Sequence, residues 1–390
     1  MTRALASPTE SPRSAPDRSA LDSSVLDSSA LDRSVPGPAR GAGRYAPSPS
    51  SDLHLGNLRT AVVAYLSARA QDLAFRLRLE DLDDRCRPRF AERQLADLAA
   101  LGVEWDGPVM RQSDRREVYR AAVDQLAAQG LVYECFCSRR DILEAPRAPH
   151  RPPGAYPGTC RDLSAAERDR RREAKRPALR LRAAVADFPI LDRLAGPSRQ
   201  PVDDFILQRA DGATAYNLAV VVDDAAQGVT EVARGDDLLT SSGRQSYLAW
   251  LLGLPPVVYA HLPLVYNSAG QRLSKRDGAM AGPELFSRHG GAAGVLVAIA
   301  ESIGLGRDDT PGWDVADSST ADESDTAESR LTGGAGPTDG DGRAGSGDEA
   351  ARGGARTRPG GIVGVNRALE MDELVGRFDW GEVKIGPWTL

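Results

Sequence analysis

Two short segments carry residue types suited to holding phosphate groups. The first is HLGN, His54 to Asn57, where a polar loop passes into an apolar helical pattern. Helix N-termini present unpaired N–H groups and the positive end of the helix dipole, and Gly56 lets a charged ligand approach the backbone closely. The second is RLSKRDG, residues 272–278. Its lysine, Lys275, could neutralise charge on a transferring phosphoryl group.

Neither segment is specific on its own. A histidine and a glycine near a helix start are common without function, and a basic loop is often a solvated turn. Lys275 is more informative than most lysines because the chain has only three, Lys175, Lys275 and Lys384, against 46 arginines. We therefore expect a chemical role for Lys275 if its loop belongs to a larger set of motifs.

Three of the four cysteines lie close together in the sequence. Cys135 and Cys137 form a C-x-C pair, and Cys160 follows a proline-rich stretch. So few cysteines cannot build a disulfide scaffold, and clustered cysteines in a reducing compartment indicate metal ligands first. Three thiolates and one further ligand would make a closed tetrahedral zinc site. The alternative is a group of partly buried free thiols, which is how we interpret the isolated Cys86.

The residues around HLGN alternate between strand and helix patterns. GRYAPS, residues 43–48, predicts a short strand, and the apolar residues after Asp52 recur at helical spacing. LAFRLRLED, residues 73–81, alternates apolar and charged side chains and predicts a strand with one polar face. A long helix is expected from Ser113, as its cap, to Gly130.

The alternation continues further along the chain. YNLAVVVDD, residues 216–224, predicts a buried strand, GRQSYLAWLLGL, residues 243–254, a helix, and VVYAHLPLVY, residues 257–266, another strand. Strands and helices in this order favour a parallel sheet. We therefore predict an α/β fold with an open, doubly wound parallel sheet.

Composition is that of an ordinary globular protein. Of 390 residues, 41% are hydrophobic and 27% are charged, and no run of about 18 or more apolar residues occurs that could span a bilayer. The N-terminal residues lack the apolar stretch of a signal peptide. We therefore expect a cytoplasmic protein without membrane segments.

Two tracts are biased in composition. Residues 1–40 are rich in Ser, Pro, Asp and Ala, and residues 307–360 in Asp, Ser, Gly and Thr. We expect both to be disordered, because they cannot bury enough apolar surface to offset the entropy of ordering. Residues 307–350 contain twelve Asp and Glu against three Arg, so the net charge of -6 leaves +3 for the rest. A mildly basic body is compatible with a nucleic-acid partner. The predicted units are thus residues 41–306 and a short segment, 361–390.

The order of the motifs GRYAPSPS, HLGN, RLRLEDLD, YNLAVVVDD, RGDDLL and RLSKRDG resembles the class I glutamyl-tRNA synthetases. HLGN falls where that family has its HIGH signature, and LSKR falls where it has KMSKS. The resemblance covers roughly residues 42–285. It implies a class I, Rossmann-type catalytic domain in residues 41–306 that activates an amino acid with ATP.

The part of the chain after Lys275 favours a shortened branch of the family. Of the 115 residues that follow, 54 belong to the acidic tract, whereas a helical anticodon-binding domain needs about 100 or more. The chain therefore resembles most the glutamyl-queuosine tRNA(Asp) synthetases, which attach glutamate to the modified base queuosine in the anticodon of tRNA(Asp).

The resemblance implies a role for individual residues, and the chemistry of glutamate agrees with it. Two carboxylates and an ammonium need arginines, whose planar fork donates two parallel hydrogen bonds, and one carboxylate. The implied glutamate site is Arg44, Tyr45, Ala46, Pro47, Ser48, Glu80, Tyr216 and Arg234. The implied ATP site is His54, Gly56, Asn57, Ser274 and Lys275, with His54 and Lys275 as catalytic residues. The alternative for each charged residue is a surface salt bridge, and for Arg234 taken alone that is the better interpretation.

Two positions depart from the family pattern. The resemblance also implies a fourth metal ligand. Asn57 replaces the second histidine of HIGH, and Val220 stands where full-length relatives often carry a polar residue, so we assign Val220 no role. The relatives use a tyrosine oxygen as fourth zinc ligand, which implies Tyr156 beside the cysteines of the loop at about 135–160. His150 is the reserve ligand.

The implied reaction uses ATP with Mg²⁺, L-glutamate and queuosine-containing tRNA(Asp), with one structural Zn²⁺. Glutamate would first form an adenylate and then be transferred to a hydroxyl of queuosine. Two alternatives remain open: a truncated glutamyl-tRNA synthetase that charges the tRNA 3' end, and a catalytically silent tRNA-binding protein with the same fold.

Overall fold

The computed structural model describes residues 41–144, 155–267, 270, 272–273, 280–306 and 370–389. The two tracts expected to be disordered, residues 1–40 and 307–360, lie outside this described part. Ser274, Lys275 and the reserve ligand His150 also lie outside it. The described segments before residue 307 and after residue 369 belong to one unit.

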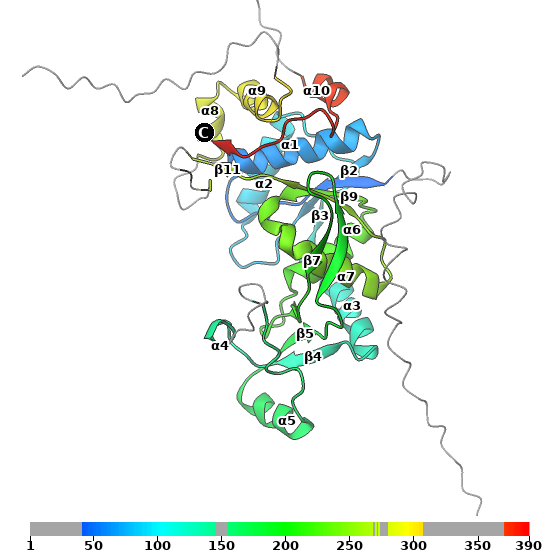
Figure 1. Ribbon diagram of the computed structural model, residues 1–390. Helices are drawn as coiled ribbons and strands as arrows, with labels where there is room; N and C mark the ends of the chain where they lie inside the picture. Colours follow the sequence, from blue (N-terminus) through cyan, green and yellow to red (C-terminus); the bar gives the residue numbers. More distant parts are fainter. Residues whose placement is uncertain are drawn as a thin grey trace, which may run out of the picture. The chain divides into compact units, whose positions relative to one another are not determined.

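A largely parallel sheet forms the centre of this unit (Figure 1). Strands β1, β2 and β3 pair in parallel in that order, and a second set runs β7, β6, β10, β9 with β6 and β7 antiparallel. The two sets meet at Ala42, whose N–H donates to the carbonyl of Gly228 at 2.9 Å and whose carbonyl accepts from the N–H of Thr230 at 2.8 Å. The predicted doubly wound parallel sheet is confirmed. Its strands are β1 (Ala42–Tyr45), β2 (Ala74–Leu79), β3 (Met110–Arg111), β6 (Asp187–Asp192), β7 (Gly196–Pro201), β9 (Glu231–Gly235) and β10 (Val258–Leu262).

Strand alternation sorts the side chains between the two faces of the sheet. On one face, Tyr45, Phe75, Ala233 and Leu262 join a hydrophobic core with helix α1 (Leu55–Ala70). Because successive residues of a strand point to opposite faces, the neighbours of these residues along each strand lie on the other face. That second face carries buried polar side chains: Arg44, Arg78, Arg234 and His261.

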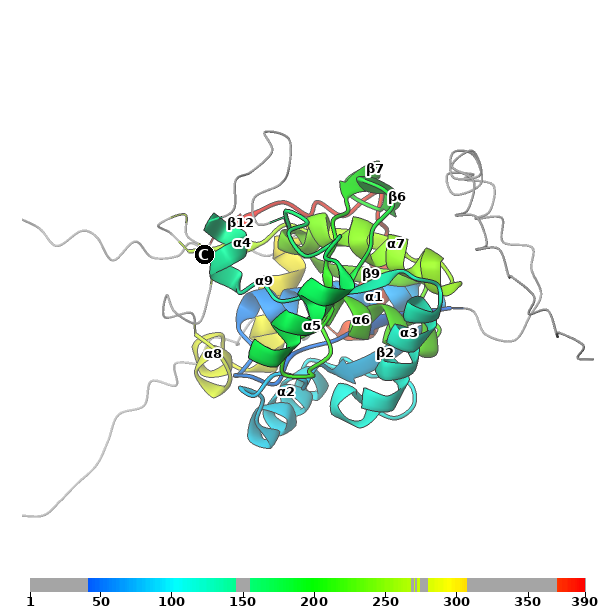
Figure 2. The same ribbon diagram turned by 90° about the horizontal axis from the view of Figure 1, so that it is seen from below.

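Helices cover both faces. Figure 1 shows α1 along one side of the sheet with α9 and α10, and these helices share one hydrophobic core. Helices α3, α6 and α7 form a second core on the other side with Phe188 of β6, and Figure 2 shows the β6–β7 hairpin at the margin of the sheet. The helices of the unit are α2 (Pro88–Ala100), α3 (Arg116–Ala128), α6 (Tyr216–Ala226), α7 (Ser242–Leu252), α8 (Pro283–Arg288), α9 (Ala292–Ser302) and α10 (Met371–Arg377), with a 3-10 turn, η4 (Asp236–Ser241).

The strand predicted at residues 216–224 is wrong, because this segment forms helix α6. An apolar run of this length does not distinguish a buried strand from a buried helix. Leu218 and Val221 are both buried in the second core, so the helix lacks the exposed face that would have revealed its period. Its last turn instead buries two carboxylates, Asp223 and Asp224.

The start of the helix predicted from Ser113 is also wrong. A 3-10 turn, η3 (Gln112–Arg115), precedes α3, which begins at Arg116 without a side-chain cap. The Ser113 hydroxyl instead donates to Asp81 at 2.8 Å. A tertiary acceptor from the loop after β2 has therefore replaced the local cap.

An antiparallel sheet carries the cysteine segment. Its order is β4, β5, β8, and two helices, α4 and α5, belong to the same region at the bottom of Figure 1. These elements are β4 (Val132–Cys135), α4 (Arg139–Glu144), α5 (Ala165–Ala174), β5 (Ala178–Leu181) and β8 (Ile206–Gln208).

Residues 370–389, part of the segment expected after the acidic tract, pack on the central unit. Met371, Leu374 and Phe378 are buried in the core of α1, and strand β12 (Trp388–Thr389) pairs in parallel with β11 (Val265–Tyr266). The last described residues thus support the strand that leads toward the Lys275 loop. Among the described residues, no helix is long and apolar enough to cross a membrane.

Candidate active site

A cavity of about 770 Å³ opens at the carboxyl ends of the parallel strands. In open α/β sheets this edge is the usual place for ligands. All the residues predicted for the glutamate and ATP sites that the structure describes line this cavity: Arg44, Tyr45, Ala46, Pro47, Ser48, His54, Gly56, Asn57, Glu80, Tyr216 and Arg234. Ser274 and Lys275 lie outside the described residues, but Arg272 and Leu273 just before them are part of the lining.

The HLGN segment forms the N-terminus of α1. His54 is the cap: its Nδ1 accepts from the N–H of Asn57 at 3.3 Å, while its own N–H donates to Asn57 Oδ1 at 3.2 Å. Because Nδ1 accepts, the neutral ring carries its proton on Nε2. A Cβ at position 56 would lie 3.2 Å from the His54 ring, so a larger residue there would have to displace the capping ring slightly. The side-chain amide of Asn57 therefore takes part in the helix cap through its oxygen, in addition to lining the cavity.

Two arginines and two carboxylates form a buried network below the cavity. Arg44 donates from Nη1 to the carbonyl of Ala233 at 3.0 Å and lies 3.4 Å from Asp224 Oδ1 through Nε. Arg78 donates to the same Asp224 oxygen at 2.8 Å and reaches Glu80 Oε1 at 3.4 Å. Burial raises the pKa of Glu80, although Arg78 and Arg44 oppose the shift. The network holds the Arg44 guanidinium and the Glu80 carboxyl group at the cavity wall.

The second cavity arginine, Arg234, leaves β9 on the same face. Its guanidinium donates to Gln245 Oε1 at 2.6 Å and to Ser242 Oγ at 2.7 Å, and it stacks 4.9 Å from the ring centroid of Tyr259. Tyr216 begins helix α6 and keeps 40% of its surface exposed. Sequence reasoning assigned no role to Arg78 or Asp224, although two carboxylates ending an apolar run were a signal of buried ion pairs.

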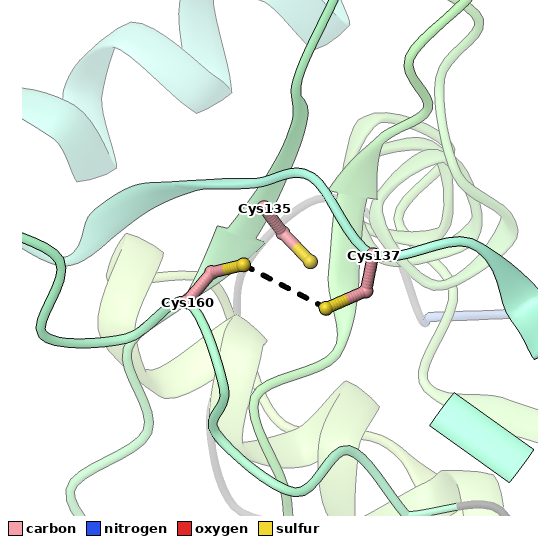
Figure 3. Close-up of side chains that lie close together, drawn as sticks. All are labelled: Cys135, Cys137 and Cys160. Carbon is pink, nitrogen blue, oxygen red and sulfur yellow. Dashed lines mark hydrogen bonds between the residues drawn. The ribbon is translucent and has the colours of Figure 1, made fainter. Parts of the chain in front are cut away.

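The three cysteines converge, as Figure 3 shows, in the region formed by β4, α4, α5, β5 and β8, which we call the insertion. The sulfurs of Cys135, Cys137 and Cys160 all lie within 4.8 Å of one another, with 3.6 Å between those of Cys137 and Cys160. The Tyr156 hydroxyl lies 3.4 Å from the sulfur of Cys135 and 3.7 Å from that of Cys137. A tetrahedron with metal–sulfur bonds of about 2.3 Å has ligand separations of about 3.8 Å. The donor set and its spacing therefore fit a single metal ion.

The surroundings of the cysteines also suit a negatively charged ligand set. The Arg180 guanidinium lies 3.7 Å from the centre of the Tyr156 ring, and Arg171 donates to the sulfur of Cys160 at 3.7 Å. Burial raises the pKa of Cys137 to about 11, and the neighbouring thiols add to the shift. Burial alone would also raise the pKa of Cys135, but hydrogen bonds with Tyr156 and Arg180 lower it. A positive charge among the sulfurs would therefore matter most for ionising Cys137.

Comparisons with known proteins agree with this arrangement. The family model described as tRNA synthetases class I (E and Q), catalytic domain, matches residues 42–304. A protein of Nocardia farcinica named glutamyl-Q tRNA(Asp) synthetase is 61% identical over 266 residues, which cover 68% of this chain and 85% of that protein. One of the same name from Cutibacterium acnes is 47% identical over 272 residues, covering 68% and 76% of the two chains.

Solved structures resemble the chain as well. The glutamate tRNA ligase of Elizabethkingia meningosepticum, crystallised in complex with its amino acid, matches with a TM-score of 0.53 and 28% identity over 61% of this chain. The glutamate-tRNA synthetase of Elizabethkingia anophelis matches with the same TM-score and identity. The chain spans about half of the length of these two proteins, 52% and 53%.

Proposed function

The chain belongs to the class I tRNA synthetases for glutamate and glutamine, in the group named glutamyl-Q tRNA(Asp) synthetase, and we propose that it transfers glutamate to queuosine in the anticodon of tRNA(Asp). The observation that carries the proposal is that a helix N-terminus, two arginines and a glutamate line one and the same cavity. ATP and tRNA are cytoplasmic substrates, so we expect the enzyme in the cytoplasm.

The first step is activation of glutamate. A carboxylate oxygen of its α-carboxyl group attacks the α-phosphorus of ATP, the bond to the bridging oxygen breaks, and pyrophosphate leaves. Arg44 and Arg234 bind the substrate carboxylates, Glu80 receives the ammonium, and Tyr216 with residues 45–48 completes the pocket. Catalysis comes from positioning and electrostatic stabilisation.

The phosphates lie at the start of α1. The N–H groups around Gly56 and the Nε2–H of His54 are donors for phosphate oxygens, and Asn57 lies beside them. ATP enters with its Mg²⁺. We propose that Lys275, with Ser274, neutralises negative charge on the α- and β-phosphates. This assignment depends on the motif that the two residues share with the family. Transfer follows when a hydroxyl of the queuosine ring attacks the adenylate carbonyl and AMP leaves.

We also propose that the protein binds one structural Zn²⁺. Cys135, Cys137, Cys160 and Tyr156 would hold it, and when bound it would link the end of β4 to residues 156–160, which precede α5. Asp203 ties this loop to the unit, since it accepts from the N–H of Tyr156 at 3.0 Å and from Arg244 of α7 at 2.6 Å.

The test separates this proposal from its alternatives. ATP–pyrophosphate exchange dependent on glutamate, measured without tRNA, distinguishes an enzyme from a silent tRNA-binding protein. Charging is then measured with tRNA(Asp) that contains queuosine, with tRNA(Asp) from cells unable to make it, and with tRNA(Glu). The proposal requires transfer to the first alone, and an ester that survives removal of the 3'-terminal adenosine. Efficient charging of tRNA(Glu) would instead establish a truncated glutamyl-tRNA synthetase.

A further inference from the structure

We propose that Asp192 and His261 are positioning residues that hold the guanidinium of Arg234 in the amino-acid pocket. Neither residue lines the cavity, whereas Arg234 does. The inference rests on the proposed function, because it takes Arg234 as a ligand for a carboxylate of glutamate. It adds a chain of buried contacts that runs from the edge of β6, through β10, to the cavity wall on β9.

This series of contacts begins at the carboxylate of Asp192, which is held in a fixed position. Asp192 ends β6, and its Oδ1 accepts from the N–H groups of Leu194 and Ala195, both at 2.9 Å. Its Oδ2 lies 2.5 Å from His261 Nδ1 and accepts from the His261 backbone N–H at 3.2 Å. Both side chains are almost fully buried, with 0% and 2% of their surface exposed. This carboxylate therefore cannot rotate without losing backbone partners.

The chemistry of the contacts sets the tautomer of His261. Arg234 Nε lies 3.0 Å from His261 Nε2, and a guanidinium can only donate. Nε2 must therefore accept, which leaves the ring proton on Nδ1, where it donates to Asp192. Burial lowers the pKa of His261, and the charge of Arg234 adds to this effect against the opposing Asp192. A neutral imidazole with one orientation links the carboxylate to the arginine.

The remaining contacts show why this orientation matters. Besides His261, the guanidinium donates to Gln245 Oε1, to Ser242 Oγ and, at 3.4 Å, to the carbonyl of Leu238. A guanidinium has five N–H donors, and these described contacts engage four of them, so one remains to meet a ligand in the cavity. Because only one N–H group is left for the substrate, a small rotation of the guanidinium would turn this group away from it.

The test compares variants of His261 that keep or remove the acceptor. His261→Leu removes it, and we expect the KM for glutamate in ATP–pyrophosphate exchange to rise about 10- to 100-fold, the range for losing a hydrogen bond to a charged group, while the KM for ATP changes less than about twofold. His261→Gln can place an amide oxygen near the position of Nε2, so it should recover most of the glutamate affinity.

Two controls separate positioning from a general structural role. Tyr133→Phe removes another buried hydrogen bond to an aspartate, the one to Asp204 at 2.7 Å in the insertion, and should lower the melting temperature without changing the KM for glutamate. In an Arg234→Ala background, His261→Leu should add less than about twofold to the glutamate KM, because the residue acts through Arg234.

The outcomes distinguish the two proposals. If the unaltered chain shows no exchange with glutamate, the proposed function and this inference both fail. If the unaltered chain is active and His261→Leu has an unchanged KM for glutamate, or raises the KM for ATP as much, the inference alone is overturned. Additive effects of His261→Leu and Arg234→Ala would also overturn it.

Discussion

Replacing Arg78 by methionine should leave a buried group of three carboxylates short of positive charge, with Arg44 still beside Asp224 and Arg115 still beside Asp223. The Arg78 side chain has no exposed surface and lies 2.8 Å from Asp224, 3.4 Å from Glu80 and 3.9 Å from Asp223. Removing one partner of a buried ion pair destabilises a protein by about 3–5 kcal/mol, because an uncompensated charge remains. For a unit of this size, that corresponds to a fall in melting temperature of roughly 5–10 °C.

The loss should depend on pH in a defined direction. Burial alone would raise the pKa of Asp224, but Arg78 and Arg44 hold it below its usual value. In the unaltered chain this pair stabilises the fold above the pKa of an unfolded aspartate, and the stabilisation is lost as pH falls through the lowered folded pKa. In Arg78→Met the pKa of Asp224 rises, so protonation relieves the stranded charge. The difference in melting temperature should therefore be largest near pH 8 and smaller near pH 5.

The assay is thermal unfolding followed by circular dichroism across this pH range. Arg85→Met is the matched control, because the Arg85 side chain is 78% exposed in its pair with Asp83 and exposed pairs contribute little. Asp224→Asn in the Arg78→Met background should recover part of the lost stability by removing one stranded charge. A difference below about 2 °C near pH 7.5, or one that is equal at pH 8 and pH 5, would refute this reasoning.

Three further predictions concern the site. Lys275→Ala should lower glutamate-dependent exchange about 100-fold or more with an unchanged melting curve, as for the loss of one preorganised electrostatic contact; exchange at the unaltered rate would contradict its assignment. Zinc should copurify at one per chain, and Cys135→Ser or Cys160→Ser should release it and increase proteolysis of the insertion without abolishing exchange; metal analysis near zero without chelator would defeat this. Tyr156→Phe should weaken zinc retention under a chelator, and unchanged retention would remove only the tyrosine ligand.

Local patterns were sufficient for much of the fold. Alternation in residues 73–81 predicts β2, and the apolar spacing after Asp52 predicts α1, because in each segment apolar residues recur at the period of one element and are buried in a common core. The same reasoning fails at residues 216–224, since the apolar residues 218–222 are consecutive and such a run fits a buried strand as well as a buried helix. It also fails at Ser113, where a carboxylate from another element competes with the helix cap.

The sequence by itself determined the residue types available for chemistry and their order along the chain. HLGN could be placed at a helix start, and the C-x-C pair with Cys160 indicated a common ligand site, since these are short-range features. Only the tertiary structure decided which distant charges share a partner. Arg78 meets Asp224 across 146 positions, and His261 meets Asp192 across 69. A buried charge needs a partner wherever it lies, but strand order and register decide which one, and no local pattern encodes them.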